Sequence, residues 1–481
     1  MHFNSVAAKW LRRRLLARAR KLTPGPLAEK AAVAALGTAR WAASCSSAYR
    51  QLLVEHGIEA ARIPRLRRLD ELPVLTKANT FGRFALSALA RDVPLSQLAD
   101  VVTSSGRSGA SFGFRLTGRA EHERSWFGID LGLEDAFEVD SRPTLLINCL
   151  PMGVVFRSRA VTVANVSVRA DMACAIARDV GSRYAQTILC TDPVFMRALL
   201  DEADAVGLDW KALNASVIVG EEPLAETQRT YFARRMQIEL DAPGHRIIAS
   251  SFGVGELGLN LMFESRATIQ IRRAARTDLE LARLLDGVAA DDVAHCNPPL
   301  VFCYNPFRVC VEVLKPDALG FGELCFTMLG RSAIIPLPRF ATGDVGRLLT
   351  AQQAGTAARL ARVNTPSLPL VLLRGTQRHR SSGHPTAESV KSWLYEDADV
   401  ADHLTGVFIL DQDSSSRPML QVQTSTTTAA HDGALLLRLQ LEASSRWPAL
   451  KVQLVDPFAF PGRPVVDYER KPRYQSLRLD R

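Results

Sequence analysis

The chain has no apolar run long enough for a membrane-spanning helix, which needs about 18–20 residues. Its first segment, MHFNSVAAKWLRRRLLARARK, carries positive charge within its apolar part and lacks a small-residue cleavage site. We therefore expect no secretory signal peptide. Apolar residues make up 47% of the sequence and charged residues 23%, as in an ordinary soluble globular protein. A length of 481 residues predicts more than one domain.

Acidic residues are absent from the first 21 positions. This segment contains seven basic residues: Lys9, Arg12, Arg13, Arg14, Arg18, Arg20 and Lys21. The whole chain has a formal charge of +9, so only +2 remains for the other 460 residues. A basic groove for nucleic acid is therefore not expected. We expect residues 1–21 to form a helix packed on the body, and its apolar spacing also allows weak contact with an anionic membrane surface or partner.

No C-x-x-C pair occurs among the 8 cysteines, although structural zinc sites usually contain one. The sequence nevertheless gathers His295, Cys296, Cys303, Cys310 and Cys325 within a short stretch. Zinc at this cluster and a metal-free, buried set of thiols both stay open. Many cysteines in a long chain without a signal peptide favour reduced thiols and a cytoplasmic location.

Helices and short strands alternate along most of the chain. Residues 1–100 are expected to be mostly helical. From about 101 to 350, buried strands such as PTLLINCL and QTILC alternate with helices such as DPVFMRALLDEADAVG. This alternation predicts an α/β domain with a largely parallel sheet. Within it, residues 301–350 form neighbouring strands joined by Gly/Pro turns, a pattern typical of a β-subdomain.

A polar segment, RGTQRHRSSGHPTAESVKSWLYED, predicts a linker and then a helix after about residue 375. Two strands and helices over 405–460 would complete a small α+β domain. The sequence thus predicts an α/β fold with a large N-terminal domain over 1–374 and a small C-terminal domain over 375–481.

Glycine, serine and threonine are concentrated in VVTSSGRSGASFGFRLTG, residues 101–118. Two glycines allow a sharp turn in which consecutive N–H groups point into one concavity. The neighbouring hydroxyls and the guanidinium of Arg107 would suit a polyphosphate, which binds many donors at short range. The G-x-x-x-x-G-K-[ST] spacing of a P-loop is missing. A plain flexible turn is the alternative interpretation of this segment.

Two further segments join strands to turns. VIVGEEPLAETQ, residues 217–228, is predicted to be a strand that ends at Gly220 and leads into a helix. SSFGVGELG, residues 250–258, places Glu256 in a tight loop after an apolar strand.

Two more segments lie nearer the C-terminus. PRFATGDVGRL, residues 338–348, is predicted to place Asp344 in a turn between extended segments. The tail DYERKPRYQSLRLDR carries Lys471 among other basic residues.

These five segments, in this order, resemble those of the adenylate-forming superfamily of acyl-CoA synthetases and adenylation domains. LDELPVLTKANT (69–80) and GELCFTML with PLPRFATGD (322–344) are similar to its phenylacetate–coenzyme A ligase-like and capsular polysaccharide biosynthesis branch. The resemblance spans roughly residues 45 to 481. It implies a large α/β domain with a β-subdomain, followed by a small mobile α+β domain.

The resemblance also implies a reaction. A carboxylic acid, expected to be aromatic or medium-sized, would react with ATP and Mg²⁺ to give an acyl-adenylate and pyrophosphate. The thiol of coenzyme A, or the phosphopantetheine of an acyl carrier protein, would then displace AMP.

Roles for individual residues follow from the same resemblance. The group at the β- and γ-phosphates would comprise Ser104, Ser105, Gly106, Arg107, Ser108 and Gly109. The group around the adenine would comprise Gly220, Glu221, Glu222, Pro223, Phe252 and Gly253. Glu256 would hold Mg²⁺, Asp344 would accept both ribose hydroxyls, and Lys471 would stabilise the transferring α-phosphate.

The chain departs from the family pattern at three places. Arg107 stands where the family usually has threonine, and Gly255 replaces a threonine or serine. The hinge candidate at residues 374–378 lacks the usual acids and has Arg378 in their place. A second hypothesis is therefore a divergent relative that makes an amide, or one that has lost catalysis and acts as a binding protein.

Overall fold

The structure is a computed structural model, and it describes residues 5–21, 24–104, 112–241, 244–287, 297–376, 385–412, 417–428, 432–461, 468–469 and 474. The chain divides into two compact units, each built from separate stretches. Unit 1 comprises residues 1–143, 157–162 and 249–377, and unit 2 comprises residues 144–156, 163–248 and 378–481.

Unit 1 contains nine α-helices in the part of the chain that the structure describes. They are α1 (Ser5–Ala19), α2 (Pro24–Cys45), α3 (Ser47–Glu55), α4 (Leu86–Leu89), α5 (Arg119–His122), α6 (Ser125–Phe137), α10 (Arg266–Ala274), α11 (Leu279–Asp286) and α12 (Ala351–Leu360). The helical prediction for residues 1–100 holds through α3, whereas residues 56–97 contain only short helical turns besides α4.

The strands of unit 1 form a hairpin and an antiparallel sheet. The hairpin pairs β1 (Leu98–Thr103) with β2 (Phe114–Gly118). The other strands are part of an 11-stranded sheet, and their order in it is β10 (Val309–Leu314), β11 (Gly322–Met328), β12 (Phe340–Leu348), β13 (Leu370–Thr376), β9 (Leu300–Tyr304), β8 (Gly258–Phe263) and β7 (Ile248–Val254). The antiparallel pairing of β10, β11 and β12 confirms the neighbouring strands joined by turns that the sequence predicts for residues 301–350. β7 and β8 lie in the region predicted to be largely parallel, and they also pair antiparallel.

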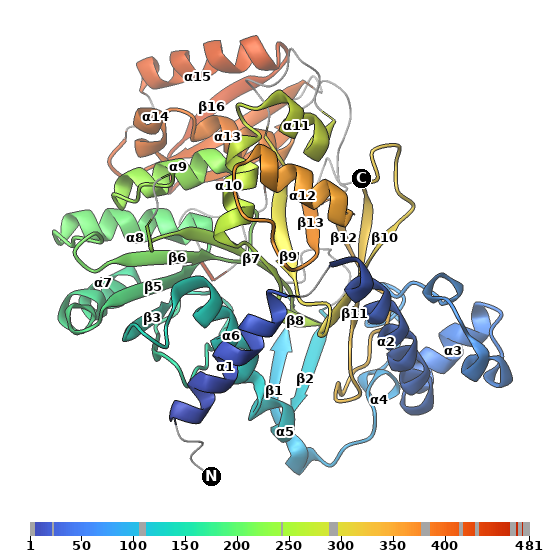
Figure 1. The fold of residues 1–481 in the computed structure, drawn as a ribbon. Helices are drawn as coiled ribbons and strands as arrows, with labels where there is room; N and C mark the ends of the chain where they lie inside the picture. The colour runs from blue at the N-terminus through green and yellow to red at the C-terminus, as the bar shows by residue number, and fades with distance from the viewer. Residues whose placement is uncertain are drawn as a thin grey trace. The chain divides into compact units, whose positions relative to one another are not determined.

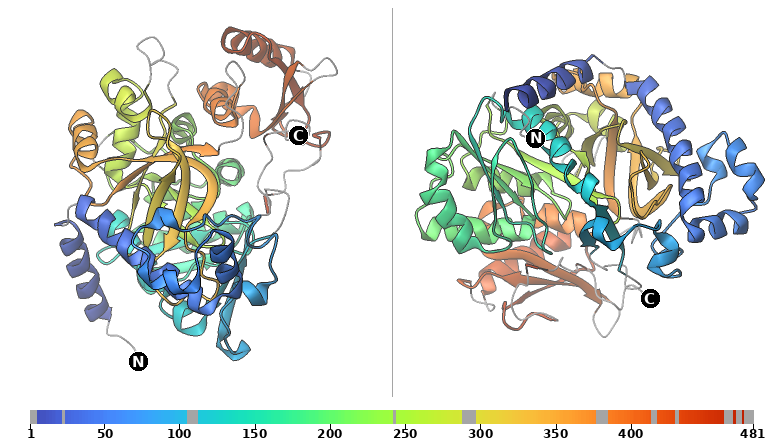
Figure 2. Two further views of the ribbon diagram at one scale, coloured as in Figure 1. Left: turned by 90° about the vertical axis from the view of Figure 1, so that its right-hand side faces the viewer. Right: turned by 90° about the horizontal axis from the view of Figure 1, so that it is seen from below.

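Helices cover both faces of this antiparallel sheet. Figure 1 shows α10 and α12 lying over β9 and β13, where apolar side chains from these elements form one core. Alanines of α2 pack with residues of β10 and β11 in another core. Figure 2 shows α2, in dark blue, beside these strands.

The predicted N-terminal helix is confirmed as α1. The guanidinium of Arg12, although charged, is buried and forms ion pairs with Asp140 and, at 3.8 Å, with Asp130. These pairs attach α1 to the end of α6, while Trp10 is exposed.

Unit 2 contains the parallel strands that the sequence predicted. Strands β3 (Thr144–Asn148), β5 (Gln186–Thr191) and β6 (Ala215–Val219) pair side by side in parallel. Helices α7 (Ala170–Asp179), α8 (Pro193–Ala205) and α9 (Glu226–Arg235) connect or follow them, and β4 (Thr162–Asn165) lies at the edge. Asp192 caps α8 by accepting hydrogen bonds from the backbone of Val194 and Phe195.

The C-terminal part of unit 2 has a sheet of its own. Its elements are α13 (Ala387–Leu394), α14 (Ala398–Asp402), β14 (Leu404–Gln412), β15 (Pro418–Thr424), α15 (Gly433–Arg446) and β16 (Lys451–Val455). β14 pairs antiparallel with β15, and β15 pairs parallel with β16. The prediction of two strands over 405–460 missed one of three, although β16 alternates exposed and buried residues as a half-buried strand does.

One apolar core joins the two parts of unit 2. Phe195 and Phe232 of the α8–α9 layer belong to the same buried cluster as Trp393, Phe408 and Leu439 of the C-terminal part. The C-terminal part is therefore packed against α8 and α9 by burial of apolar surface.

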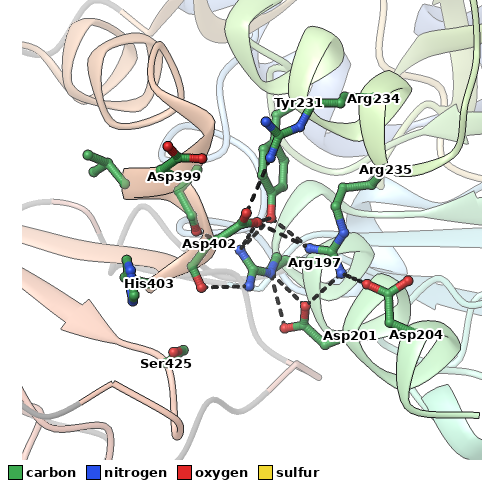
Figure 3. A network of polar contacts seen from close by, with 12 residues as sticks. Arg197, Asp201, Asp204, Tyr231, Arg234, Arg235, Asp399, Asp402, His403 and Ser425 are labelled. Carbon is green, nitrogen blue, oxygen red and sulfur yellow. Dashed lines mark hydrogen bonds and ion pairs between the residues drawn. The ribbon is translucent and has the colours of Figure 1, made fainter.

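A polar network reinforces this packing (Figure 3). Arg197 donates to the hydroxyl of Tyr231 at 2.6 Å and to the carbonyl oxygens of Ala401 and Asp402 at 2.5 and 3.0 Å. The Tyr231 hydroxyl in turn donates to Asp402 Oδ1 at 2.6 Å. Burial is the main cause that raises the pKa of Tyr231 well above its usual value. The hydroxyl thus stays protonated and can serve as the donor.

In the part of the chain that the structure describes, no helix is long and apolar enough to cross a membrane.

Candidate functional site

Three polar side chains from distant segments meet in unit 1. The ammonium of Lys77 lies 2.8 Å from Glu256 Oε1 and donates to the hydroxyl of Ser104 at 2.9 Å. Lys77 lies in the LDELPVLTKANT segment, Ser104 follows β1, and Glu256 lies in the turn between β7 and β8. Two of the three, Ser104 and Glu256, are predicted site residues. Lys77 is a new member of the group.

Ser104 closes the base of the glycine- and serine-rich loop. Its backbone N–H donates to the carbonyl of Gly113 at 3.0 Å, and Gly113 N–H donates to the Ser104 hydroxyl at 3.0 Å. A Cβ on Gly113 would lie 2.0 Å from Glu256 Oε1, so only glycine allows the hairpin to approach this carboxylate. The predicted phosphate-loop residues Ser105, Gly106, Arg107, Ser108 and Gly109 lie outside the described residues.

Phe252 and Gly253 lie within strand β7, whereas the sequence predicted a tight loop for the whole segment; only residues 255–257 form the turn. The strand continues because β8 pairs with it closely: a Cβ on Gly253 would lie 2.4 Å from the carbonyl oxygen of Leu259. The ring of Phe252 stacks on that of Phe326, with centroids 5.8 Å apart. One face of Phe252 thus belongs to the core.

The same turn lies against the start of the loop. A Cβ on Gly255 would lie 3.1 Å from Ser104 Cα, closer than most real Cβ contacts. A serine or threonine at position 255 would therefore require the neighbouring backbone to shift.

Glu256 is a buried carboxylate whose charge is only partly compensated. Its side chain is 2% exposed, and that of Lys77 is 23% exposed. Among the residues that the structure describes, Oε1 has no partner that meets hydrogen-bond geometry, although the Lys77 ammonium is near. The contact is therefore an ion pair without a directional hydrogen bond. A buried carboxylate oxygen in this state has capacity for a further cation.

Asp344 lies in β12 rather than in the predicted turn. Gly343, with φ of +82°, and shifts in the pairing of β12 with both neighbours mark an irregular stretch inside the strand. The N–H of Gly343 donates to Glu323 Oε1 at 3.1 Å, and the side chain of Asp344 is half-buried. The bulge produces the local turn that the sequence suggested without ending the strand.

Backbone hydrogen bonds join the segment that carries Lys77 to the start of β12. The N–H of Leu75 donates to the carbonyl of Arg339 at 2.9 Å, and the N–H of Ala341 donates to the carbonyl of Leu75 at 2.8 Å. Arg339, held at 3.1 Å by Glu312, supports this crossing. Lys77 and Asp344 therefore come from neighbouring backbone segments.

In unit 2, the predicted adenine segment follows β6. The N–H of Gly220 donates to the carbonyl of Thr191 at 2.9 Å, and the N–H of Glu222 donates to the carbonyl of Gly220 at 2.8 Å. Between them, Glu221 has φ of +68°, a left-handed conformation that is uncommon for a residue with a side chain. Pro223 is half-buried and follows this strained turn.

Carboxylates gather at the carboxyl ends of β5 and β6, the edge at which open parallel sheets bind ligands. Burial, with smaller contributions from the nearby charges of Glu222 and Glu221, raises the pKa of Asp192 to about 6. Lys391 of α13 donates to Glu222 Oε2 at 3.1 Å, and both side chains are almost fully buried.

Lys471 lies outside the described residues, but its neighbours are held in unit 2. Glu469 accepts hydrogen bonds from the N–H of Met152 at 2.7 Å and from the hydroxyl of Ser167 at 2.8 Å. The N–H of Leu410 donates to the carbonyl of Tyr474 at 2.8 Å.

The cysteine cluster does not form a metal site among the residues that the structure describes. Cys303, Cys310 and Cys325 are buried free thiols, and burial raises the pKa of Cys303 and of Cys310 to about 12. His295 and Cys296 lie outside the described residues.

No protein-family model matches the chain, and no curated protein matches its sequence. Its fold is similar to that of 2-hydroxyisobutyryl-CoA ligase in the postadenylation state in complex with 2-HIB-AMP. The TM-score is 0.63 at 14% identity, over 94% of this chain and 91% of that chain. The same ligase with 2-HIB-AMP and CoA in the thioesterification state gives a TM-score of 0.52 at 15% identity, over 95% and 92%.

This likeness shows that the chain has the fold of these ligases, with a mixed α/β body and a smaller C-terminal sheet. The predicted fold class is therefore confirmed. The closer resemblance to the phenylacetate–coenzyme A ligase-like branch, the domain boundary at 374/375 and the roles of individual residues stay predictions.

Proposed function

We propose that the chain is an adenylate-forming ligase that uses ATP to join a carboxylic acid to a thiol. The observation that carries this proposal is the cluster of Lys77, Ser104 and Glu256 at the base of the glycine- and serine-rich loop. It combines a cation, a hydroxyl and an incompletely paired carboxylate in a fold shared with an acyl-CoA ligase. Those are the groups that binding of a metal–polyphosphate complex requires.

In the first half-reaction, a carboxylate oxygen of the acid would attack the α-phosphorus of ATP. The bond from the α-phosphorus to the bridging oxygen breaks, and pyrophosphate leaves with the electron pair. Charge develops on the α-phosphate oxygens, and a fixed cation stabilises it. Lys471 is our candidate for that cation.

The residues at Glu256 fit Mg²⁺. A buried carboxylate oxygen without a hydrogen bond is a ligand for a hard cation, and the nearby Lys77 ammonium already holds positive charge there. Glu256 would hold the ion, which would neutralise phosphate charge when bound. The mobile stem of a lysine allows the Lys77 ammonium to turn toward a phosphate.

The loop and the strands around it would bind the rest of the nucleotide. Donors from the loop at residues 104–109, including Arg107, would bind the β- and γ-phosphates. Asp344 would accept hydrogen bonds from the ribose hydroxyls. Glu323 would help to orient Asp344, because it accepts a hydrogen bond from the N–H of the neighbouring Gly343.

The base would be received by the other predicted residues. Backbone groups of Gly220, Glu221, Glu222 and Pro223 would read the adenine edge. Phe252 would offer the ring face that does not stack on Phe326, and Gly253 would leave room for close approach.

In the second half-reaction, the sulfur of a thiol would attack the acyl carbon. The bond from that carbon to the phosphate oxygen breaks, AMP leaves, and the thiol proton passes to water. We propose coenzyme A or a carrier-protein phosphopantetheine as the thiol, an aromatic or medium-sized acid, and a cytoplasmic setting that suits the free thiols of the described residues.

ATP–pyrophosphate exchange tests the proposal directly. The purified chain is given ATP, Mg²⁺, labelled pyrophosphate and a panel of aliphatic and aromatic acids. Exchange that depends on one class of acid supports adenylation. No exchange with any acid, despite a folded protein that binds ATP, would favour the non-catalytic relative. With an active acid in hand, mass spectrometry of mixtures with coenzyme A, carrier protein or amines identifies the acceptor.

A further inference from the structure

A lysine from the C-terminal part of unit 2 is buried against the predicted adenine turn. Lys391 lies on α13, whereas Glu222 follows β6, and their side chains are 4% and 3% exposed. The ammonium also lies 4.0 Å from the centre of the Tyr474 ring, a favourable position for a cation. Lys391 therefore has a fixed place, unlike a lysine on the surface.

The charge of Lys391 meets an excess of negative charge. Glu222 and Glu221 follow β6, and Asp192 follows the neighbouring strand β5. The negative charges of Glu222 and Glu221 are among the causes that raise the pKa of Asp192, after its burial. Without an ammonium at Glu222, the carboxylates would repel each other and also the phosphates of a nucleotide.

The turn itself stores strain. Glu221 adopts a left-handed conformation, which persists only where the surroundings hold it. The next residue, Glu222, is held by its N–H on Gly220 and by its carboxylate on Lys391. The ion pair is thus one of the contacts that keep the strained turn in shape.

We infer that Lys391 is a positioning residue for the nucleotide: by holding Glu222, it keeps the turn at residues 220–223 in the shape that receives adenine. Nucleotide affinity then depends on a side chain supplied by the C-terminal part of the chain. The inference rests on the proposed function, because it assumes that this turn binds a nucleotide.

The test is equilibrium binding of AMP and of ATP, measured by calorimetry well below the unfolding temperature. Lys391→Gln is expected to weaken both affinities by about tenfold or more, since one buried charge pair is lost. Lys391→Arg, which keeps the charge, should restore most of the affinity. Lys451→Gln, on the exposed end of β16, is the matched control and should bind like the parent.

A merely structural role predicts a different result. It would lower the unfolding temperature of Lys391→Gln but leave the AMP affinity of the folded variant unchanged, and that outcome would overturn the inference. Hydrogen exchange gives an independent readout: a peptide covering residues 215–225 should exchange faster in Lys391→Gln while peptides from β14 should not.

If Lys391→Gln does not fold, Lys391→Met fills the same volume without a charge and carries the test in its place. If the parent itself binds neither AMP nor ATP, the proposed function fails and the inference falls with it. If the parent binds and Lys391→Met binds equally well, only the inference fails.

Discussion

Two buried charges, Arg197 in unit 2 and Glu256 in unit 1, have very different sets of partners. In unit 2, Arg197 is surrounded by acceptors, and the carboxylate of Asp402 accepts from Tyr231. In unit 1, Glu256 faces a single ammonium and has an oxygen without a hydrogen bond among the described residues. Burial alone does not separate a structural charge from a functional one. The difference lies in how completely the hydrogen-bonding capacity is used, because saturated groups hold a fold and unsaturated groups hold a ligand.

The largest effect is expected at Lys471, which we propose stabilises charge in the adenylation transition state and does not bind the substrates. Lys471→Ala should lower ATP–pyrophosphate exchange by on the order of a hundredfold or more, because a fixed charge is lost from the transition state. Thioester formation from pre-made acyl-adenylate should survive. Lys451→Ala serves as the control. An unchanged exchange rate would remove Lys471 from the mechanism.

Removing a saturated charge from unit 2 should act on stability. Arg197→Met leaves the carbonyls of Ala401 and Asp402 without their donor and removes one of the two donors to the Tyr231 hydroxyl, which should lower the free energy of unfolding by about 1–3 kcal/mol. Urea denaturation measures this change. Arg178→Met, which removes an exposed pair with Asp179, should change the free energy of unfolding far less. Equal losses in the two variants would mean that the network contributes nothing special.

Removing the charge of Glu256 in unit 1 should affect activity more than stability. Glu256→Gln should lower the exchange rate by roughly tenfold or more and flatten its dependence on Mg²⁺, since an amide binds a hard cation poorly. The unfolding temperature should change little, because Lys77 remains partly solvated. Glu55→Gln, in an exposed pair with Arg83, is the matched control. A large loss of stability with parental Mg²⁺ dependence would place Glu256 among the structural charges.

Asp344→Ala sharpens the comparison inside unit 1. Loss of the ribose acceptor should raise the ATP concentration needed for half-maximal exchange by about tenfold, while the rate at saturating ATP stays close to the parent's. Titration of ATP at fixed acid measures both. Parental behaviour in this variant would exclude Asp344 from the nucleotide site.

The smallest expected effect concerns Asp192, a carboxyl in unit 2 that is buried near other acids. Its pKa of about 6 in the folded chain exceeds the usual value near 4, so the folded state binds its proton more tightly. Stability from this group is present at low pH and is lost as the pH rises through about 4 to 6. Asp192→Asn, which still caps α8, should therefore be more stable than the parent at pH 7 and about as stable as the parent at pH 4. Denaturant titrations at the two pH values decide this.

Patterns that depend on neighbours along the chain were predictable from the sequence. The β-branched residues before the loop and the extended run after it correctly indicate β1 and β2, and the Asp-Pro start of α8 correctly marks a capped helix. The strand that ends before Gly220 was also predictable, because apolar run, glycine and helix follow one another.

Contacts between distant segments were not predictable in this way. Lys77 meets Glu256 because the chain returns to the same place, and no local spacing records that encounter. The antiparallel pairing of β7 with β8 was not predicted, because an apolar strand reads the same in either direction. Asp344 was assigned to a turn because Thr-Gly-Asp is a turn sequence, whereas pairing on both sides converts the turn into a bulge.

The interleaving of the two units has a consequence for how the chain is made. Residues 144–248 supply only part of the unit 2 core, and Val390, Trp393 and Phe408 supply the rest. On the ribosome, the apolar faces of α8 and α9 must therefore wait, uncovered, while well over a hundred further residues are synthesised. Arg197 and Tyr231 sit on those same faces, so the nascent chain presents a surface in which apolar patches carry fixed polar groups. Until residues 401 and 402 are made, Arg197 and Tyr231 lack the acceptors that bind them in the folded chain.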